Sequence, residues 1–420
     1  MRKRTVAIVL LVVIFGVGVP AAVPVIRAQT GYRAAEELLA YQLWPQARQR
    51  LASYLWLHPH DGKARLLMAE AFAKDDALPS DEAASQAIDC LAQIPDNSPL
   101  AAEARLRQGG LCFLVLQKPG RAEQLVRKSI ELGGGLPAYE LLWTLLNFTG
   151  RSEDTEETFW RVYELSSDDQ RPLVLRQWYV SQFFPLRANE PLDRSMGILA
   201  PPESPTRTTE SRRYLRFRER EPEAAVNHVA VAQWFQEERD PEFAARLLDA
   251  AAKEFPSSKS DAFFLSVSIA TQLDLGQFDA AQAAFRRWPE SDRGHAYWKW
   301  HAIILDDALG KYEEALAAYD QALALWPGPA DWRLGHRRAG CLARLRRPEE
   351  SAASIDRIER LKELMDVESH ERLRVALGSL SDPEQLTVVA KFYRQLGRDR
   401  EADCWEKHIQ RLQAHATAQR

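Results

Sequence analysis

The sequence predicts an all-α protein built as a solenoid of antiparallel helix pairs. One skeleton recurs along most of the 420 residues: an alanine, an apolar residue four positions on, a small residue three further, and then a helix breaker. In the stretch KYEEALAAYDQALALWP these positions are Ala315, Tyr319, Ala322 and Pro327. Such pairs stack on their neighbours, so the array grows unit by unit and not around one central core.

The alanines that begin the second helix of each pair set the length of the repeat. They are Ala47, Ala83, Ala122, Ala244, Ala281, Ala315, Ala352 and Ala402. Within each half of the chain most intervals are about 34 to 39 residues, which is typical of a two-helix repeat. The wider interval before Ala402 predicts an extra helix near residues 368–377.

The first helices carry a second pattern, in which a small residue lies between bulky ones. Leu106, Gly109, Gly110 and Phe113 show it clearly. A small residue lets the two helices of a pair approach, and the aromatic ring fills the space beside it. Together these patterns resemble the tetratricopeptide repeat family over roughly residues 34 to 412. The resemblance implies a right-handed superhelix with ligands on its concave side.

Two segments depart from the repeat. In the unit that begins at His295, Ile303 replaces the expected glycine and Asp306 replaces the expected aromatic residue. The proline-rich stretch 185–205 has no helical period, and the charged segment 210–221 then returns to helical composition, as a connecting helix or as a basic docking site. We therefore predict an N-terminal segment at 1–30, a first array at 31–185, a break at 186–222 and a second array at 223–420.

The N-terminal segment has the features of a membrane anchor. A basic triplet at 2–4 precedes an uncharged run at 5–26, which as helix would measure about 33 Å and could cross a hydrocarbon core of about 30 Å. The basic end favours the cytoplasm, so we expect a single-pass inner-membrane protein with extracytoplasmic repeats. The alternative is a signal peptide cleaved after Ala21, Ala22 or Ala28, which gives a secreted or periplasmic protein.

Charge and residue types exclude several classes of function. The formal net charge of −4 argues against nucleic-acid binding, which needs a surplus of basic residues. His58, His60 and Asp61 lack a third histidine or cysteine ligand, and the glycines at 133–135 lack the lysine and hydroxyl of a phosphate-binding loop. We therefore predict a solvated turn and a helix end at these places, with no enzyme activity, no metal, no cofactor and no small-molecule substrate.

The four cysteines have no C-x-x-C spacing, which indicates small buried residues. The alternative is one disulfide in an exported chain, for which Cys90 and Cys112 are the best pair because they fall in successive helices.

The family resemblance also implies which side chains face the concave groove. They are Arg107, Asn147, Gln233, Gln236, Trp300, Asp307, Arg337, Arg344, Lys391 and Arg394. The last four form a basic stripe that suits an acidic peptide or a C-terminal carboxylate, unless it is only a solvated arginine face. Trp300 serves either as a groove anchor or as packing against a neighbouring unit.

Taken together, the predicted function is a scaffold of the cell envelope that holds a protein or peptide in its groove. An anchor followed by repeats resembles envelope-assembly scaffolds, including those that serve polysaccharide or lipopolysaccharide export. The alternative function is a non-catalytic subunit of an envelope enzyme or polysaccharide-export complex.

Overall fold

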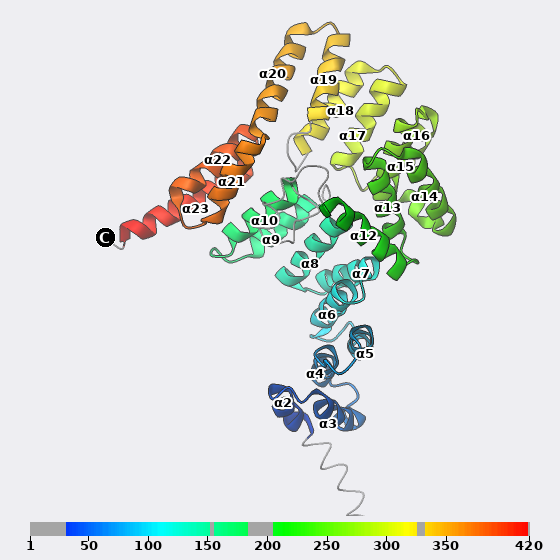
Figure 1. The fold of residues 1–420 in the computed structure, drawn as a ribbon, viewed down its shortest axis with the longest axis vertical. Coiled ribbons are helices and arrows are strands. Elements are labelled where there is room, and N and C mark those ends of the chain that lie inside the picture. The colour runs from blue at the N-terminus through cyan, green and yellow to red at the C-terminus, as the bar shows by residue number, and fades with distance from the viewer. Residues whose placement is uncertain (1–30, 152–154, 184–204, 326–331, 419–420) are drawn as a thin grey trace, which may run out of the picture. The chain divides into compact units, whose positions relative to one another are not determined.

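The computed structural model describes residues 31–151, 155–183, 205–325 and 332–418, and within these ranges it contains helices and no strand. The all-α prediction is confirmed for this part of the chain (Figure 1). The chain divides into two compact units, unit 1 at Met1–Leu141 and unit 2 at Leu142–Arg420.

Unit 1 is a series of antiparallel helix pairs in which each helix packs against the next. Its helices are α2 (Gly31–Ala40), α3 (Trp44–Leu57), α4 (Gly62–Ala73), α5 (Ser80–Ala92), α6 (Ala101–Leu114) and α7 (Pro119–Glu131), and α8 (Gly135–Phe148) crosses into unit 2. The glycines at 133–135 follow the end of α7, as predicted. Asp61 is engaged as the N-cap of α4, where its side chain accepts from the backbone N–H groups of Lys63 and Ala64.

Unit 2 continues with helix pairs of the same kind. Its helices are α9 (Glu156–Leu165), α10 (Arg171–Phe183), α12 (Pro205–Arg220), α13 (Ala225–Glu237), α14 (Pro241–Glu254), η3 (Pro256–Ser260), α15 (Ala262–Asp274), α16 (Phe278–Phe285), α17 (His295–Ile303), η4 (Ile304–Ala308), α18 (Tyr312–Leu325), α19 (Trp332–Arg344), α20 (Pro348–Leu364), α21 (Val367–Gly378), α22 (Pro383–Leu396) and α23 (Asp399–Ala418). The predicted extra helix near 368–377 is α21, and the charged segment 210–221 forms most of α12.

The predicted repeat register holds at seven of its eight alanines. Ala47, Ala122, Ala244, Ala281, Ala315 and Ala402 are fully buried, and Ala83 is nearly so. The prediction is wrong at Ala352, which is exposed. Ser351 is buried there instead, and its hydroxyl donates to the carbonyl of Ala339 at 2.9 Å. A serine fits this crowded position because the backbone of the partner helix satisfies its hydroxyl.

The boundary between the units differs from the predicted break at 186–222. The helices α9 and α10 belong to unit 2 (Figure 1). α10 contacts α21, α22 and α23, and Glu164 of α9 pairs with Arg400 of α23. Tyr393 donates to Gln182 at 2.9 Å, and Trp178 donates to Glu401 at 3.2 Å. α10 is consequently buried on nearly all sides, unlike a helix at the free end of an array.

The predicted anchor at 5–26 and most of the proline-rich stretch lie outside the described residues. Among the residues that are described, no helix is long and apolar enough to cross a bilayer.

Candidate functional site

The first helices of successive repeats in unit 2 are joined side by side through polar side chains. We call α13, α15, α17 together with the π-helical turn η4 that continues it, and α19 the first-helix wall. The links are Gln236 to Asp274 at 2.7 Å, Trp300 to Ser266 at 2.8 Å and Arg337 to Asp307 at 2.7 Å. Four of the predicted groove residues, Gln236, Trp300, Asp307 and Arg337, therefore lie on neighbouring helices of one surface.

The wall is irregular where the sequence departs from the family pattern. α17 ends at Ile303 and passes into a π-helical turn, η4, at Ile304–Ala308. Here Asp306 points inward and is 5% exposed, whereas the side chain of Asp307 is accessible. Single π-helical turns occur often at functional sites, and this one presents two adjacent carboxylates to α19 in different directions.

Asp306 organises the polar interior beside this turn. Its carboxylate accepts from the Tyr319 hydroxyl at 3.0 Å and pairs with Arg344. Burial, together with the charge of Asp306, raises the pKa of Tyr319 and raises that of the Cys341 thiol to about 12. Tyr319 and Cys341 therefore stay protonated and act as hydrogen-bonding groups. In the sequence, Asp306 stands out only as a departure from the family pattern, and its adjacency to Asp307 is the available signal of its role.

One face of α19 carries arginines that meet these carboxylates. Arg333, Arg337 and Arg344 share a face because they are separated by about one and two helical turns. Burial lowers the pKa of Arg337, but Asp307 outweighs that effect and holds the pKa above its ordinary value. Arg344 also lies over the ring of Tyr312, 5.2 Å from its centroid. Arg333 is exposed and has no ion pair among the described residues.

Trp300 packs against the neighbouring repeat. Its ring lies among the buried side chains of α15, α17 and α18, and the ammonium of Lys299 lies 5.0 Å from its centroid. The indole N–H is engaged with Ser266, as described above. Of the two predicted roles for Trp300, packing against a neighbouring unit therefore describes its environment. Trp300 is nevertheless only partly buried.

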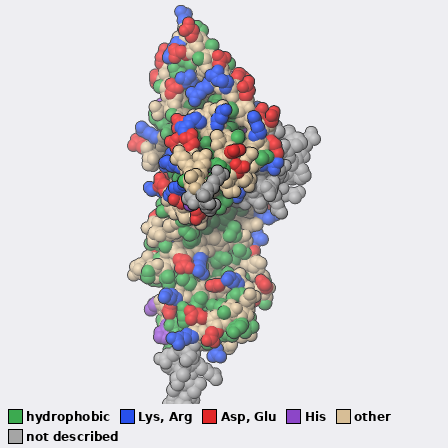
Figure 2. Space-filling model, turned by 90° about the vertical axis from the view of Figure 1, so that its left-hand side faces the viewer, with side chains coloured by type: hydrophobic (Ala, Val, Ile, Leu, Met, Phe, Trp, Pro, Cys, Tyr) green, Lys and Arg blue, Asp and Glu red, His purple; other side chains and the backbone are tan. Residues whose placement is uncertain are grey.

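The predicted basic stripe is largely compensated by acidic partners. Arg394 on α22 pairs with Asp399, Asp403 and Glu406, and hydrogen bonds to these carboxylates raise its pKa. Lys391 is exposed and has no ion pair among the described residues. On the face that Figure 2 shows, acidic and basic side chains are interspersed. The arginines of the stripe therefore produce a weaker positive field than the sequence suggested.

The remaining predicted groove residues lie in three different environments. Arg107 is exposed on α6 in unit 1 and pairs with Glu103 on the same helix at 2.6 Å. Asn147 is 1% exposed and donates to the carbonyl of Trp143, so its side chain lies in the interior. Gln233 is half-buried on α13 and donates to Glu237 at 3.0 Å.

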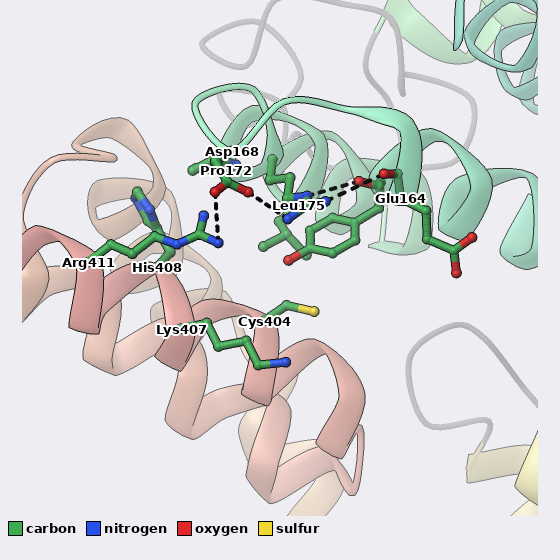
Figure 3. A pocket seen from close by; sticks show the side chains of 10 residues that line it. Glu164, Asp168, Pro172, Leu175, Cys404, Lys407, His408 and Arg411 are labelled. Atoms are coloured by element: carbon green, nitrogen blue, oxygen red, sulfur yellow. Dashed lines mark hydrogen bonds and ion pairs between the residues drawn. The ribbon is translucent and has the colours of Figure 1, made fainter. Parts of the chain in front are cut away.

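A separate cavity of about 300 Å³ lies between the α9–α10 pair and α23 (Figure 3). It is lined by Tyr163, Glu164, Asp168, Arg171, Pro172, Leu175, Cys404, Lys407, His408 and Arg411. Asp168 accepts from Arg171 at 2.6 Å and pairs with Arg411 at 3.1 Å. Burial raises the pKa of Cys404, so the cavity holds a protonated thiol and not a reactive thiolate.

All four cysteines are free thiols in the structure. The alternative of a disulfide between Cys90 and Cys112 is therefore not what the structure shows. Burial raises the pKa of the Cys90 thiol to about 11.

The buried imidazole of His370 should make unit 2 less stable in mild acid. His370 Nδ1 lies 2.6 Å from the Tyr179 hydroxyl and the ring packs on Phe183. Burial lowers the pKa of His370 more than Asp366, the charged group beside it, raises it. The unfolded chain therefore binds more protons below about pH 6.5, and stability is lost as the pH falls through that value.

Urea midpoints near pH 7.5 and pH 5.5 measure this dependence. We expect a lower midpoint at the acidic pH and a smaller difference in His370→Gln. Part of the difference should persist because burial also lowers the pKa of His301. An equal difference in the variant and the parent would rule out His370 as the source.

Comparison with known families identifies the repeat. Residues 303–363, which contain η4, α18, α19 and most of α20, match the family model described as tetratricopeptide repeat. Residues 303–363 form a tetratricopeptide repeat segment. These repeats generally mediate protein–protein interactions and are typically non-catalytic, and they present extended surfaces for partners. No curated protein matches this chain.

Two solved structures are similar to this chain at low identity. The APC/C hetero-tetramer Cut9–Hcn1 is 11% identical, with a TM-score of 0.37, over 92% of this chain and 73% of that chain. The human IFIT1 dimer with m7Gppp-AAAA is 11% identical, with a TM-score of 0.30, over 90% of this chain and 80% of that chain. These low scores say nothing about the partners of this chain.

Proposed function

We propose that this chain is a scaffold of the cell envelope that binds another protein along its first-helix wall. The observation that carries the proposal is the continuity of the wall: polar side chains join α13, α15, α17 and α19 in order. A linear segment of a partner can then lie across several repeats, because each repeat presents equivalent positions. The chain lends this surface to an assembly and performs no chemistry itself.

The membrane location is part of the same proposal. It rests on the uncharged run at 5–26 and the basic residues before it, which favour an inner-membrane anchor with the repeats outside the cytoplasm. The tetratricopeptide repeats would then be held close to the membrane surface and could collect an envelope protein there.

An acidic segment of the partner suits the part of the wall around η4. Arg333 offers a guanidinium that no described carboxylate occupies. The pair between Arg337 and Asp307 is partly accessible, with side chains 42% and 28% exposed. Such accessible pairs stabilise by only about 0 to 1 kcal/mol, so a carboxylate of a partner can replace Asp307 at little cost.

Photocrosslinking in native membranes tests the proposal. A benzoylphenylalanine in place of Arg333, on the wall, is expected to crosslink a protein that mass spectrometry can identify. The same residue in place of Ile355, on α20, is the matched control, because Ile355 is 42% exposed and lies on a second helix away from the wall. We expect the adduct at position 333 to exceed that at 355 at least roughly fivefold, as for a partner seated on one surface.

Two outcomes would contradict the wall as the binding surface. One is an adduct of the same partner at position 355 alone, which would assign binding to the second helices. The other is equal labelling of many proteins at both positions, which would indicate collisions and not a specific scaffold.

A further inference from the structure

A large aromatic side chain is exposed at one end of unit 1. Trp56 is 74% exposed near the end of α3, and Leu57 beside it is half-buried. Its neighbour Tyr54, two residues earlier, faces the opposite way and packs on Tyr32, with ring centroids 5.5 Å apart. Trp56 therefore contributes little to the interior of the repeat, and its ring is accessible to a partner outside the chain.

The end that carries Trp56 is also the end where the described chain begins. Gly31, the first residue of α2, lies directly against α3, because a Cβ built on Gly31 would be 3.0 Å from the Arg50 carbonyl and 3.5 Å from Tyr54. The start of α2, the end of α3 and the start of α4 thus form one surface, which we call the Trp56 end.

The Trp56 end carries exposed cations, with the exposed Glu36 about one turn further along α2. Arg33 and Lys63 are exposed, as is His60 in the turn between α3 and α4. Asp61 is the acidic residue of that turn, and it is engaged with the Tyr54 hydroxyl at 2.9 Å and with the backbone at the start of α4. An exposed indole with flanking basic groups is complementary to anionic lipid headgroups.

The short segment between the predicted anchor and α2 limits the distance between the anchor and the Trp56 end. The uncharged run ends at Ile26 and α2 begins at Gly31. The five residues from Ile26 to Gly31 span at most roughly 17 Å even when fully extended. If the run crosses the bilayer, the Trp56 end must lie within reach of the headgroup layer.

We propose that the Trp56 end of unit 1 contacts the lipid headgroup region, with Trp56 inserted at the interface and Arg33 and Lys63 beside anionic headgroups. This inference rests on the membrane-anchored part of the proposed function. It adds that the first repeat is seated on the membrane by its own side chains and is not only tethered to it.

Lipid photocrosslinking of the full chain tests the contact. The chain is reconstituted in vesicles of phosphatidylethanolamine and phosphatidylglycerol, with benzoylphenylalanine in place of Trp56. Tyr41 is the matched control position, because it is 78% exposed and lies in the turn at the other end of α2, about 15 Å away. We expect lipid adducts at position 56 to exceed those at position 41 at least roughly fivefold, as for a side chain at the interface.

Carbonate extraction of the same vesicles shows whether a negative result contradicts the lipid contact alone or the membrane anchor as well. If the chain stays in the membrane and position 56 forms no more lipid adducts than position 41, the contact is overturned and the anchor stands. If the chain is released, or is recovered from cells as a soluble form that begins after Ala21, Ala22 or Ala28, both the anchor and the contact are overturned.

Discussion

Replacing Glu401 with alanine is expected to destabilise unit 2 by about 3 to 5 kcal/mol, the range for breaking a buried ion pair. Glu401 is 1% exposed and accepts from the Trp178 indole at 3.2 Å and from Arg398 at 2.6 Å. Burial lowers the pKa of Arg398, but Glu401 and Glu156 outweigh it and hold the pKa above its ordinary value. The variant removes the Glu401 carboxylate from a largely buried guanidinium and removes the acceptor of the Trp178 indole.

Denaturant unfolding followed by tryptophan fluorescence measures this effect. The matched control is Glu406→Ala, an acidic residue on the same helix, α23, whose partner Arg394 keeps Asp399 and Asp403. The control is expected to leave the unfolding midpoint nearly unchanged because Glu406 is exposed. A change within about 0.5 kcal/mol for Glu401→Ala, as is typical of a surface site, would contradict the packing of α10 against α23.

The fold could be predicted because its information is local. The buried alanines recur within each helix pair, and a small residue between two helices is needed wherever they approach closely. Ala281 and Ala315 show this register directly, since both are fully buried. The error at Ala352 has a simple cause: Ser351 and Ala352 are both small, and periodicity alone could not decide which of them faces inward.

The contacts that complete unit 2 could not be predicted in this way. Trp178 and Glu401 are 223 residues apart, and no periodic pattern links them. The same holds for Tyr179 and His370, which are 191 residues apart. A helix in the middle of an array and a helix that packs against a distant part of the chain can have the same apolar composition. The predicted division at residue 185 therefore rested on the prolines alone.

The candidate site was predicted in part. The family register assigned Trp300, Asp307 and Arg337 to the first helices of their repeats. In the structure Trp300 lies on α17, Asp307 on its continuation η4 and Arg337 on α19. The register could not show that the arginines meet carboxylates, since Asp306 reaches Arg344 only through the π-helical turn. Charge counted along the sequence therefore overstated the positive field.

Replacing Ala315 with arginine should destabilise unit 2 by at least about 3 kcal/mol, because it places a charge between the two helices of a repeat in place of a fully buried methyl group. Ala315 is fully buried on α18 among Ala302, Ile303 and Leu334. The longer side chain must also displace these neighbours, which adds the cost of overpacking. The urea midpoint of the full chain measures the loss, and circular dichroism shows whether the remaining helices persist.

The matched control is Ala317→Arg, which introduces the same side chain two residues away on the same helix. Ala317 is exposed because a step of two residues on a helix points to a different face. Its effect should stay within about 0.5 kcal/mol, the range of a surface substitution. Equal losses at the two positions would mean that α18 does not present Ala315 to α17 and α19. The polar links from Trp300, Asp307 and Arg337, which depend on the same packing, would then lose their structural basis as a binding surface.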